Sequence, residues 1–184
     1  MAAYRRGIFP WYSPGQPVLW WSPDPREVLF PAEFHRSRSL RLALRTRGFE
    51  YHVDRDFEAV LAACAAPRQG SPGTWITTEM RAAYLALHHR GIAHSAEIWR
   101  SGRLVGGVYG VRLGLVFFGE SMFSRERDGS KAALDGLVRQ CLADGTAVID
   151  CQQPSAHLRS LGSRAIPRQD FLALLARAAG PEKG

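Results

Sequence analysis

The stretch from Leu104 to Phe118 constrains the fold more than any other part of this chain. It is the most apolar segment, yet Arg112 and four glycines interrupt it, and it is shorter than the roughly 20 residues that a membrane-spanning helix needs. The segment is therefore expected to form strands inside a globular protein. Because Ser101 and Gly102 give a turn signal after the strand Ala96 to Trp99, we expect an antiparallel meander whose third strand is Leu115 to Phe118.

Helical and strand patterns alternate on both sides of this meander. Helices are expected at about residues 37–47, 57–65, 77–90 and 129–143, and strands at 28–30, 49–53 and 148–151. A loop with Gly70, Pro72 and Gly73 precedes the third of these helices. A short helix, the segment Ala165 to Pro167 and a last helix through Leu175 complete the chain. The first 25 residues hold five prolines, which limits regular structure there to a short strand at Val18 to Trp21.

Length and composition fit one main globular domain. The chain has 184 residues, of which 46% are hydrophobic and 22% charged, and no segment has the low hydrophobicity and high charge of a disordered chain. The three cysteines lie far apart and form no CxxC pair, which argues against a disulfide framework or a structural zinc site. No signal peptide is recognisable before Pro10, so a cytoplasmic protein without membrane contact is expected.

The charge balance indicates an anionic partner. The net charge is +7, and only Lys131 and Lys183 among the 24 basic residues are lysines. The planar arginine side chain suits phosphate, so nucleic acid is a plausible partner. An arginine-rich genome would also explain the scarcity of lysine, although not the positive balance. On the helix 37–47 three arginines share one face, which is either a solvated surface or a phosphate-binding stripe: Arg38, Arg41 and Arg45.

Asp150 and Gln152 are the strongest candidates for catalytic residues. They lie two apart on a buried strand, so both side chains are expected on one face and Cys151 on the other, in the core. A carboxylate at the end of an apolar strand is costly unless it is hydrogen-bonded. From the residues alone, a capping role for Asp150 is as plausible as a catalytic one. Nothing nearby marks Cys151 as an activated nucleophile with His94 or His157, so a cysteine hydrolase is rejected.

The order helix, antiparallel strands, helix, strand resembles the fold of the GCN5-related N-acetyltransferases, which is an α+β fold with a mixed, largely antiparallel sheet flanked by helices. A coenzyme A enzyme of this fold would begin its central helix with Gln/Arg-x-x-Gly-x-Gly/Ala. The corresponding residues Glu126 to Lys131 match one of the three fixed positions, and Glu126 and Asp128 would repel a pyrophosphate. An acyl-CoA N-acyltransferase is therefore the second interpretation. An RNA-binding protein without catalysis is the third.

Nine blocks spread in order over the chain resemble the bacterial leucyl/phenylalanyl-tRNA–protein transferases. They are YRRGIFPW (4–11), LWWSPDPR (19–26), GTWIT (73–77), HSAEIW (94–99), LVGGVYG (104–110), FGESMFSR (118–125), IDCQ (149–152), HLRSLG (157–162) and IPR (166–168).

The resemblance implies transfer of leucine or phenylalanine, and less readily methionine, from aminoacyl-tRNA to the N-terminal amine of proteins that begin with Arg or Lys. The product would be marked for degradation by the N-end rule. The partners implied are the charged tRNA and the acceptor protein, and no metal or small cofactor is implied. A monomer is expected.

The same resemblance assigns roles to single residues. Trp11 and Trp75, in loops bounded by proline and glycine where an aromatic ring can stack on a base, match the tryptophans that hold the 3′ terminal adenosine. Asp150 and Gln152 match the proposed catalytic pair, and Arg38, Arg41 and Arg45 fall in the basic cluster that faces the tRNA. The aminoacyl pocket would be lined by Val108, Phe117, Leu134, Leu137 and Ile149. Glu120 is our candidate for receiving the N-terminal Arg or Lys, because a basic enzyme needs a local acid to attract a basic terminus.

Two departures from the family concern the N-terminal lobe and the pocket. Family members carry some three dozen residues before the tyrosine of YRRGIFPW, so residues 1–27 are expected to be the remnant of a small, truncated N-terminal domain and residues 28–184 the aminoacyltransferase domain. Leu137 stands where a larger aromatic pocket residue is expected, which leaves the preference between leucine and phenylalanine open.

Overall fold

A mixed β-sheet forms the centre of the protein. The computed structural model describes residues 1–13, 15–67 and 74–180, and in this part the main sheet has seven strands in the order β4-β5-β6-β7-β8-β3-β9. Their bounds are Arg26–Leu29 (β3), Glu50–Val53 (β4), Ala93–Arg100 (β5), Arg103–Leu113 (β6), Val116–Ser124 (β7), Val148–Gln152 (β8) and Arg164–Ile166 (β9). Neighbouring strands of this sheet are antiparallel except β7 and β8, which are parallel.

The predicted meander is confirmed as β5, β6 and β7. Ser101 and Gly102 join β5 to β6 with φ values of 49° and 73°, the left-handed conformation that a tight hairpin turn of this kind requires. β7 runs to Ser124, six residues beyond the expected end at Phe118. The polar residues Glu120 and Ser121 interrupt the apolar run, but Gly119 and Ser121 still pair with β6, and Glu120 lies at the register shift between these two pairs.

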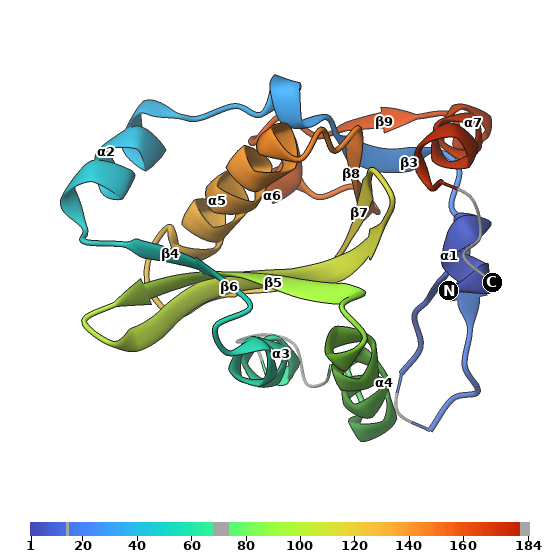
Figure 1. Cartoon of the computed structure of the whole chain (residues 1–184), viewed down its shortest axis with the longest axis horizontal. Coiled ribbons are helices and arrows are strands. Elements are labelled where there is room, and N and C mark those ends of the chain that lie inside the picture. The colour runs from blue at the N-terminus through green and yellow to red at the C-terminus, as the bar shows by residue number, and fades with distance from the viewer. Residues whose placement is uncertain (14, 68–73, 181–184) are drawn as a thin grey trace.

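Helices cover both faces of the sheet. Those of the described part are α1 (Ala2–Arg5), α2 (Arg38–Thr46), α3 (Phe57–Ala65), α4 (Thr78–His89), α5 (Gly129–Ala143), α6 (Ala156–Arg159) and α7 (Arg168–Ala178), with a short 3-10 helix at Pro31–Glu33. Figure 1 shows α5 on one side of β5 and β6 and α3 with α4 on the other. Thr77 and Ser37 begin α4 and α2 as expected, because each side chain accepts a hydrogen bond from the amide three residues on.

The sheet separates two hydrophobic cores. One core joins α3 and α4 to α7 and the N-terminal residues Tyr4 and Phe9. The other joins α5 to Leu40 of α2 and to the facing strands. The parallel pair β7 and β8 is connected by α5, as a parallel connection requires. This arrangement confirms the predicted α+β class with a mixed sheet flanked by helices.

The N-terminal residues pack beside the main sheet as a small hairpin. β1 (Phe9–Pro10) pairs with β2 (Trp20–Trp21) in a separate two-stranded sheet. The expected strand at Val18 to Trp21 is therefore shorter than predicted. The predicted loop at Gly70, Pro72 and Gly73 lies outside the described residues. No helix in the described ranges is long and apolar enough to cross a membrane.

Candidate active site

A cavity of about 1010 Å³ opens where β7 and β8 separate. The two strands pair over three residues, from Val116 to Phe118 on β7 and from Val148 to Asp150 on β8. The residues that follow on both strands, among them Glu120 and Gln152, line the cavity together with parts of α3 and α5. The divergence of two parallel neighbours therefore creates the site, and the IDCQ and FGESMFSR blocks form its two strand edges.

One end of the cavity is apolar. Val108, Leu134, Leu137 and Ile149 all line it, and all four are at least 94% buried. They come from β6, α5 and β8, so three separate elements converge on the same space. A wall of branched aliphatic side chains accepts an apolar group and excludes a charged one through the cost of desolvation.

Phe117 does not line this cavity, in contrast to the expectation for the aminoacyl pocket. Its ring belongs to the same core as the four wall residues, but it lies over Gly110 of β6. A Cβ atom at Gly110 would come within 2.5 Å of the Phe117 ring and 2.1 Å of the carbonyl oxygen of Phe118. Phe117 therefore fills the space over that glycine behind the wall.

Asp150 is held in a buried ion pair. Its carboxylate accepts hydrogen bonds from Arg26 at both oxygens, from Nε at 2.8 Å and from an Nη atom at 2.6 Å, and neither side chain is exposed. The second Nη atom of Arg26 donates to the carbonyl oxygen of Gly7 at 2.9 Å. Asp150 is not among the residues that line the cavity, so its carboxylate lies one layer behind the surface that a substrate would meet.

Gln152 and Cys151 both contribute to the cavity wall. The backbone of Gln152 has a φ of 66°, which ends the strand alternation from which its direction was predicted. Its amide donates to Oδ1 of Asp150 at 2.9 Å, and its side-chain nitrogen is buried. Cys151, expected to contact only the core, also lines the cavity; burial raises the pKa of its thiol well above the ordinary value, which opposes a thiolate nucleophile.

Glu120 faces the cavity from the β7 side. Its carboxylate accepts hydrogen bonds from the hydroxyl groups of Tyr4 at 2.7 Å and Tyr84 at 2.8 Å. Burial raises the pKa of Glu120 to about 7, against the lowering effect of these two hydroxyl groups and of Gln152. The nearby charge of Asp150 adds to the increase. The cavity thus contains a carboxyl group that changes charge near neutral pH.

The two tryptophans assigned to the adenosine lie in different places. Trp75 lines the cavity, where its ring packs edge-on against Tyr84 with 6.4 Å between ring centres. Trp11 is not among the lining residues. It lies at the N-terminal hairpin, 42% exposed, with its ring centre 6.0 Å from that of Trp21. The structure therefore does not bring the two tryptophans together at one cavity.

The arginine stripe is exposed on α2. Arg38, Arg41 and Arg45 lie on the solvent side of the helix, whereas Leu40 and Ala43 are buried against the core. None of the three arginines forms an ion pair or a side-chain hydrogen bond with another described residue. Their neighbours differ in this respect, because Arg36 pairs with Asp135 of α5 and Arg47 with Asp128. Three guanidinium groups are thus available to phosphate.

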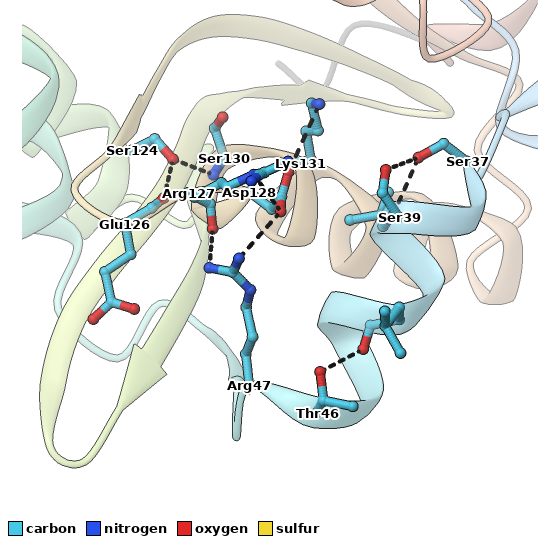
Figure 2. A network of polar contacts seen from close by, with 12 residues as sticks. Ser37, Ser39, Thr46, Arg47, Ser124, Glu126, Arg127, Asp128, Ser130 and Lys131 are labelled. Atoms are coloured by element: carbon cyan, nitrogen blue, oxygen red, sulfur yellow. Dashed lines mark hydrogen bonds and ion pairs between the residues drawn. The ribbon is translucent and has the colours of Figure 1, made fainter.

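The N-terminus of α5, where coenzyme A would be held, uses its own amides internally. Figure 2 shows Ser124 accepting from the amide of Ser130, at 3.0 Å, and the amide of Gly129 donates to the carbonyl oxygen of Glu126 at 3.0 Å. Asp128 lies within 3.9 Å of Arg47, 3.8 Å of Arg127 and 3.7 Å of Lys131. Cations of the chain itself therefore surround this acid, and its repulsion of a pyrophosphate is weaker than the sequence indicated. The amides of Gly129 and Ser130 already donate to groups of the chain itself, so they do not offer the hydrogen bonds with which a helix N-terminus holds the pyrophosphate of coenzyme A.

Sequence reasoning missed three residues of the site. Arg26 belongs to the LWWSPDPR block, yet its role as partner of Asp150 depends on a residue 124 positions away. Tyr4 and Tyr84 hold Glu120 from α1 and α4. The available signal for Arg26 was its position at the start of a strand that continues into the apolar run Val28 to Phe30, where a charged side chain must find a buried partner.

The fold and the cavity define an enzyme that seats an apolar group beside a polar reaction centre. No group of three or more potential metal ligands occurs among the described residues.

Residues 28–176 match the family described as "Leucyl/phenylalanyl-tRNA protein transferase", and residues 1–24 match its N-terminal domain. The chain belongs to this family, and it is an aminoacyltransferase that acts with an aminoacyl-tRNA and a protein substrate.

Two relatives support the same assignment. The leucyl/phenylalanyl-tRNA–protein transferase of Azotobacter vinelandii is 60% identical over 169 residues, which are 92% of this chain and 75% of the relative. The enzyme of Pseudomonas paraeruginosa is 58% identical over 177 residues, or 96% of this chain and 78% of the relative.

A solved structure of a GCN5-related N-acetyltransferase-like protein from Streptococcus suis aligns with 14% identity and a TM-score of 0.42, over 90% of this chain and 61% of that one. The α+β class is defined by the mixed seven-stranded sheet and the helices that flank it.

Proposed function

We propose that this protein transfers leucine or phenylalanine, and less readily methionine, from aminoacyl-tRNA to the N-terminal amine of proteins that begin with Arg or Lys, which marks these proteins for N-end-rule degradation. The observation that carries the proposal is one cavity with an aliphatic end, formed by Val108, Leu134, Leu137 and Ile149, and a polar edge with Gln152 and Glu120. Membership of the family supports it.

The chemistry makes modest demands on the protein. The acceptor α-nitrogen attacks the carbonyl carbon of the tRNA ester, a C–N bond forms, the ester C–O bond breaks, and one amine proton ends on the ribose oxygen. An α-amine has a pKa of about 7.7 to 8, so part of it is neutral near pH 7.5. Orientation of the two substrates should then supply most of the rate.

Gln152 is the proposed group at the reacting amine. Its side chain lines the cavity, and a carboxamide carries both an acceptor and a donor. Asp150 does not transfer a proton in this proposal, because both of its oxygens accept from Arg26. It orients Gln152 through the backbone amide of that residue.

Glu120 is the proposed site for the basic N-terminal side chain of the acceptor. It is the carboxylate that faces the cavity beside Gln152, and its negative charge would favour Arg or Lys over neutral side chains. Replacement of Glu120 by Gln should raise the KM for a peptide that begins with Arg about tenfold or more. An unchanged KM would remove Glu120 from this role.

The tRNA is proposed to bind along α2 and at the cavity mouth. The exposed Arg38, Arg41 and Arg45 would contact its phosphates, and Trp75 would stack on the terminal adenosine. Trp11 stays in this proposal as a second contact of the tRNA on the N-terminal hairpin, outside the cavity. A monomer with residues 1–27 as a small N-terminal lobe and residues 28–184 as the transferase domain completes the proposal.

The proposal is tested by mixing the protein with radiolabelled leucyl-tRNA and peptides that begin with Arg, Lys or Ala. Label should enter the Arg and Lys peptides and not the Ala peptide. An absence of label on the Arg peptide would contradict the proposed function. Tight coenzyme A binding in calorimetry would favour the acyl-CoA alternative, and equal binding of charged and uncharged tRNA without transfer would favour an RNA-binding protein.

A further inference from the structure

Arg26 is a fully buried cation at the junction of three parts of the molecule. Its guanidinium group donates to both carboxylate oxygens of Asp150 and to the carbonyl oxygen of Gly7. The same group lies between two aromatic rings, 4.8 Å from the centre of Phe9 and 4.6 Å from that of Phe171. One side chain thus connects the N-terminal residues, α7 and the strand that carries the candidate catalytic residues.

The guanidinium group of Arg26 contacts the Asp150 carboxylate at two atoms and packs between two aromatic rings, which a lysine ammonium group could not do. A lysine ammonium is a point charge, whereas the planar fork of arginine matches a carboxylate at two atoms and packs flat between rings. A buried carboxylate without its partner would be costly. Arg26 therefore pairs with the buried carboxylate and fixes the orientation of Asp150.

Asp150 passes this constraint on to Gln152. Its Oδ1 atom accepts both from Nε of Arg26 and from the backbone amide of Gln152. Gln152 has a φ of 66°, a left-handed conformation that is strained for a non-glycine residue and persists only where its surroundings hold it. The pairing with Glu27 of β3 and the hydrogen bond to Asp150 are the backbone contacts that hold this conformation, and this conformation places the side chain at the cavity.

We propose that Arg26 is a positioning residue for aminoacyl transfer, which acts through Asp150 to hold Gln152 in its left-handed conformation at the cavity. This inference rests on the proposed function and adds to it a residue that touches no substrate. It also gives the N-terminal residues a part in the reaction, because Gly7 and Phe9 hold Arg26 in place.

Replacement of Arg26 by Lys tests the proposal in steady-state transfer to an Arg-starting peptide. We expect kcat to fall about 100-fold, since a displacement of about 1 Å at a catalytic group has that effect, while the KM for leucyl-tRNA stays within about twofold. Combining Arg26→Lys with Gln152→Ala should lower kcat no further than Gln152→Ala alone, because the two residues act as one unit. Multiplied losses, or a wild-type kcat in Arg26→Lys, would overturn the proposal.

Arg164→Lys is the matched control. Arg164 lies on β9, next to β3, and also forms a two-point ion pair with a carboxylate, at 2.9 Å and 3.3 Å from the Glu33 oxygens, but this pair is exposed and outside the cavity. It should keep the wild-type kcat. If Arg26→Lys fails to fold, Asp150→Asn replaces it in the same measurement. The double variant Asp150→Asn with Gln152→Ala should then have the same kcat as Gln152→Ala alone.

Amide hydrogen exchange gives a readout that does not depend on transfer. The Gln152 amide should exchange at least about tenfold faster in Arg26→Lys, or in Asp150→Asn if Arg26→Lys does not fold, than in the wild type, while amides of β5 and β6 keep their protection. An unchanged exchange rate would overturn the proposal even if the wild-type protein transferred nothing. An inactive wild-type protein with this exchange pattern would contradict the proposed function and support the positioning of Gln152 by Arg26.

Discussion

At the scale of single residues, the site combines two carboxylates with opposite surroundings. Asp150 is paired with a guanidinium group at both oxygens, whereas Glu120 is buried among neutral hydroxyl groups. Burial raises the pKa of Glu120 to about 7, against the lowering effect of the two hydroxyl groups. The charge of Glu120 therefore responds to pH near neutrality.

The stability of the protein should report the burial of Glu120. Its pKa is raised to about 7 by burial, so its ionisation favours unfolding as pH rises from about 4.5 to 7. The titratable groups that face Glu120 are Tyr4, Tyr84, Tyr109 and Asp150. The neutral side chain of Gln152 also acts on it. We expect Glu120→Gln to be as stable as the wild type at pH 4 and more stable by about 3 kcal/mol at pH 8.

Urea unfolding at the two pH values measures this difference. Tyr109→Phe is a suitable control because it changes a neighbouring hydroxyl group and leaves the carboxyl group in place. A Glu120→Gln variant that is less stable than the wild type at pH 8 would mean that the carboxylate is stabilised in the fold, contrary to the burial described.

At the scale of secondary-structure elements, a polar cluster joins β5 to the turn before α3. Nδ1 of His94 lies 2.7 Å from Asp54, and the Ser95 amide donates to Asp54 at 2.6 Å. The hydrogen bond to Asp54 raises the pKa of His94. Burial alone would raise the pKa of Asp54, but the hydrogen bonds from His94 and Ser95 outweigh it and lower the pKa.

The cluster should stabilise the fold in one pH window. A raised histidine pKa gives stability that is complete below the unfolded value of about 6.5 and is lost as pH rises through the folded value; a lowered aspartate pKa gives stability above about 4 that is lost in more acid solution. Gly91, Arg112 and His88 are the other groups that act on the pair. Replacement of His94 by Gln should cost about 1 kcal/mol at pH 5.5 and much less at pH 9.

Thermal unfolding of His94→Gln at both pH values tests this. His52 forms a matched control, since it lies on β4 and pairs with Glu50 at 3.8 Å on the exposed edge of the sheet. An equal loss at pH 5.5 and pH 9 would show that the His94 ring stabilises the protein by packing and not by charge.

The arginines of α2 carry the prediction for nucleic acid binding. Replacement of Arg38, Arg41 and Arg45 by Gln should weaken tRNA binding. It should also make the fall of log affinity with log salt concentration shallower, by about 2 to 3 in the magnitude of the slope, which is roughly one per lost phosphate contact. Filter binding at several salt concentrations measures the slope. Arg177→Gln, an exposed arginine on α7, is the control. An unchanged slope would mean that the stripe is only a solvated surface.

Across the whole molecule, the order of elements could be predicted from the sequence and the depth of single side chains could not. Periodicity and capping residues located α2, α3, α4 and α5 within two residues of their bounds. The hidden position of Asp150 depends on Arg26, and the shift of Phe117 out of the cavity depends on the missing Cβ at Gly110. Arg26 and Asp150 are 124 positions apart, and Phe117 meets Gly110 across a strand pair, so neither contact can be read from the pattern within one element. The resemblance to the family supplied most of the candidate site. The structure shows which of these residues line the cavity, such as Ile149 and Gln152, and which lie behind its surface, such as Asp150 and Phe117.

The central claim is that the aliphatic end of the cavity holds the transferred side chain while Gln152 and Glu120 meet the acceptor. The most direct measurement is single-turnover transfer to one Arg-starting peptide from leucyl-, phenylalanyl- and lysyl-tRNA, each at the same concentration. We expect leucine and phenylalanine to be transferred at least about 100-fold faster than lysine, because a charged side chain would lose its hydration against Val108, Leu134, Leu137 and Ile149. Lysine transfer at a rate similar to that of leucine would contradict this account.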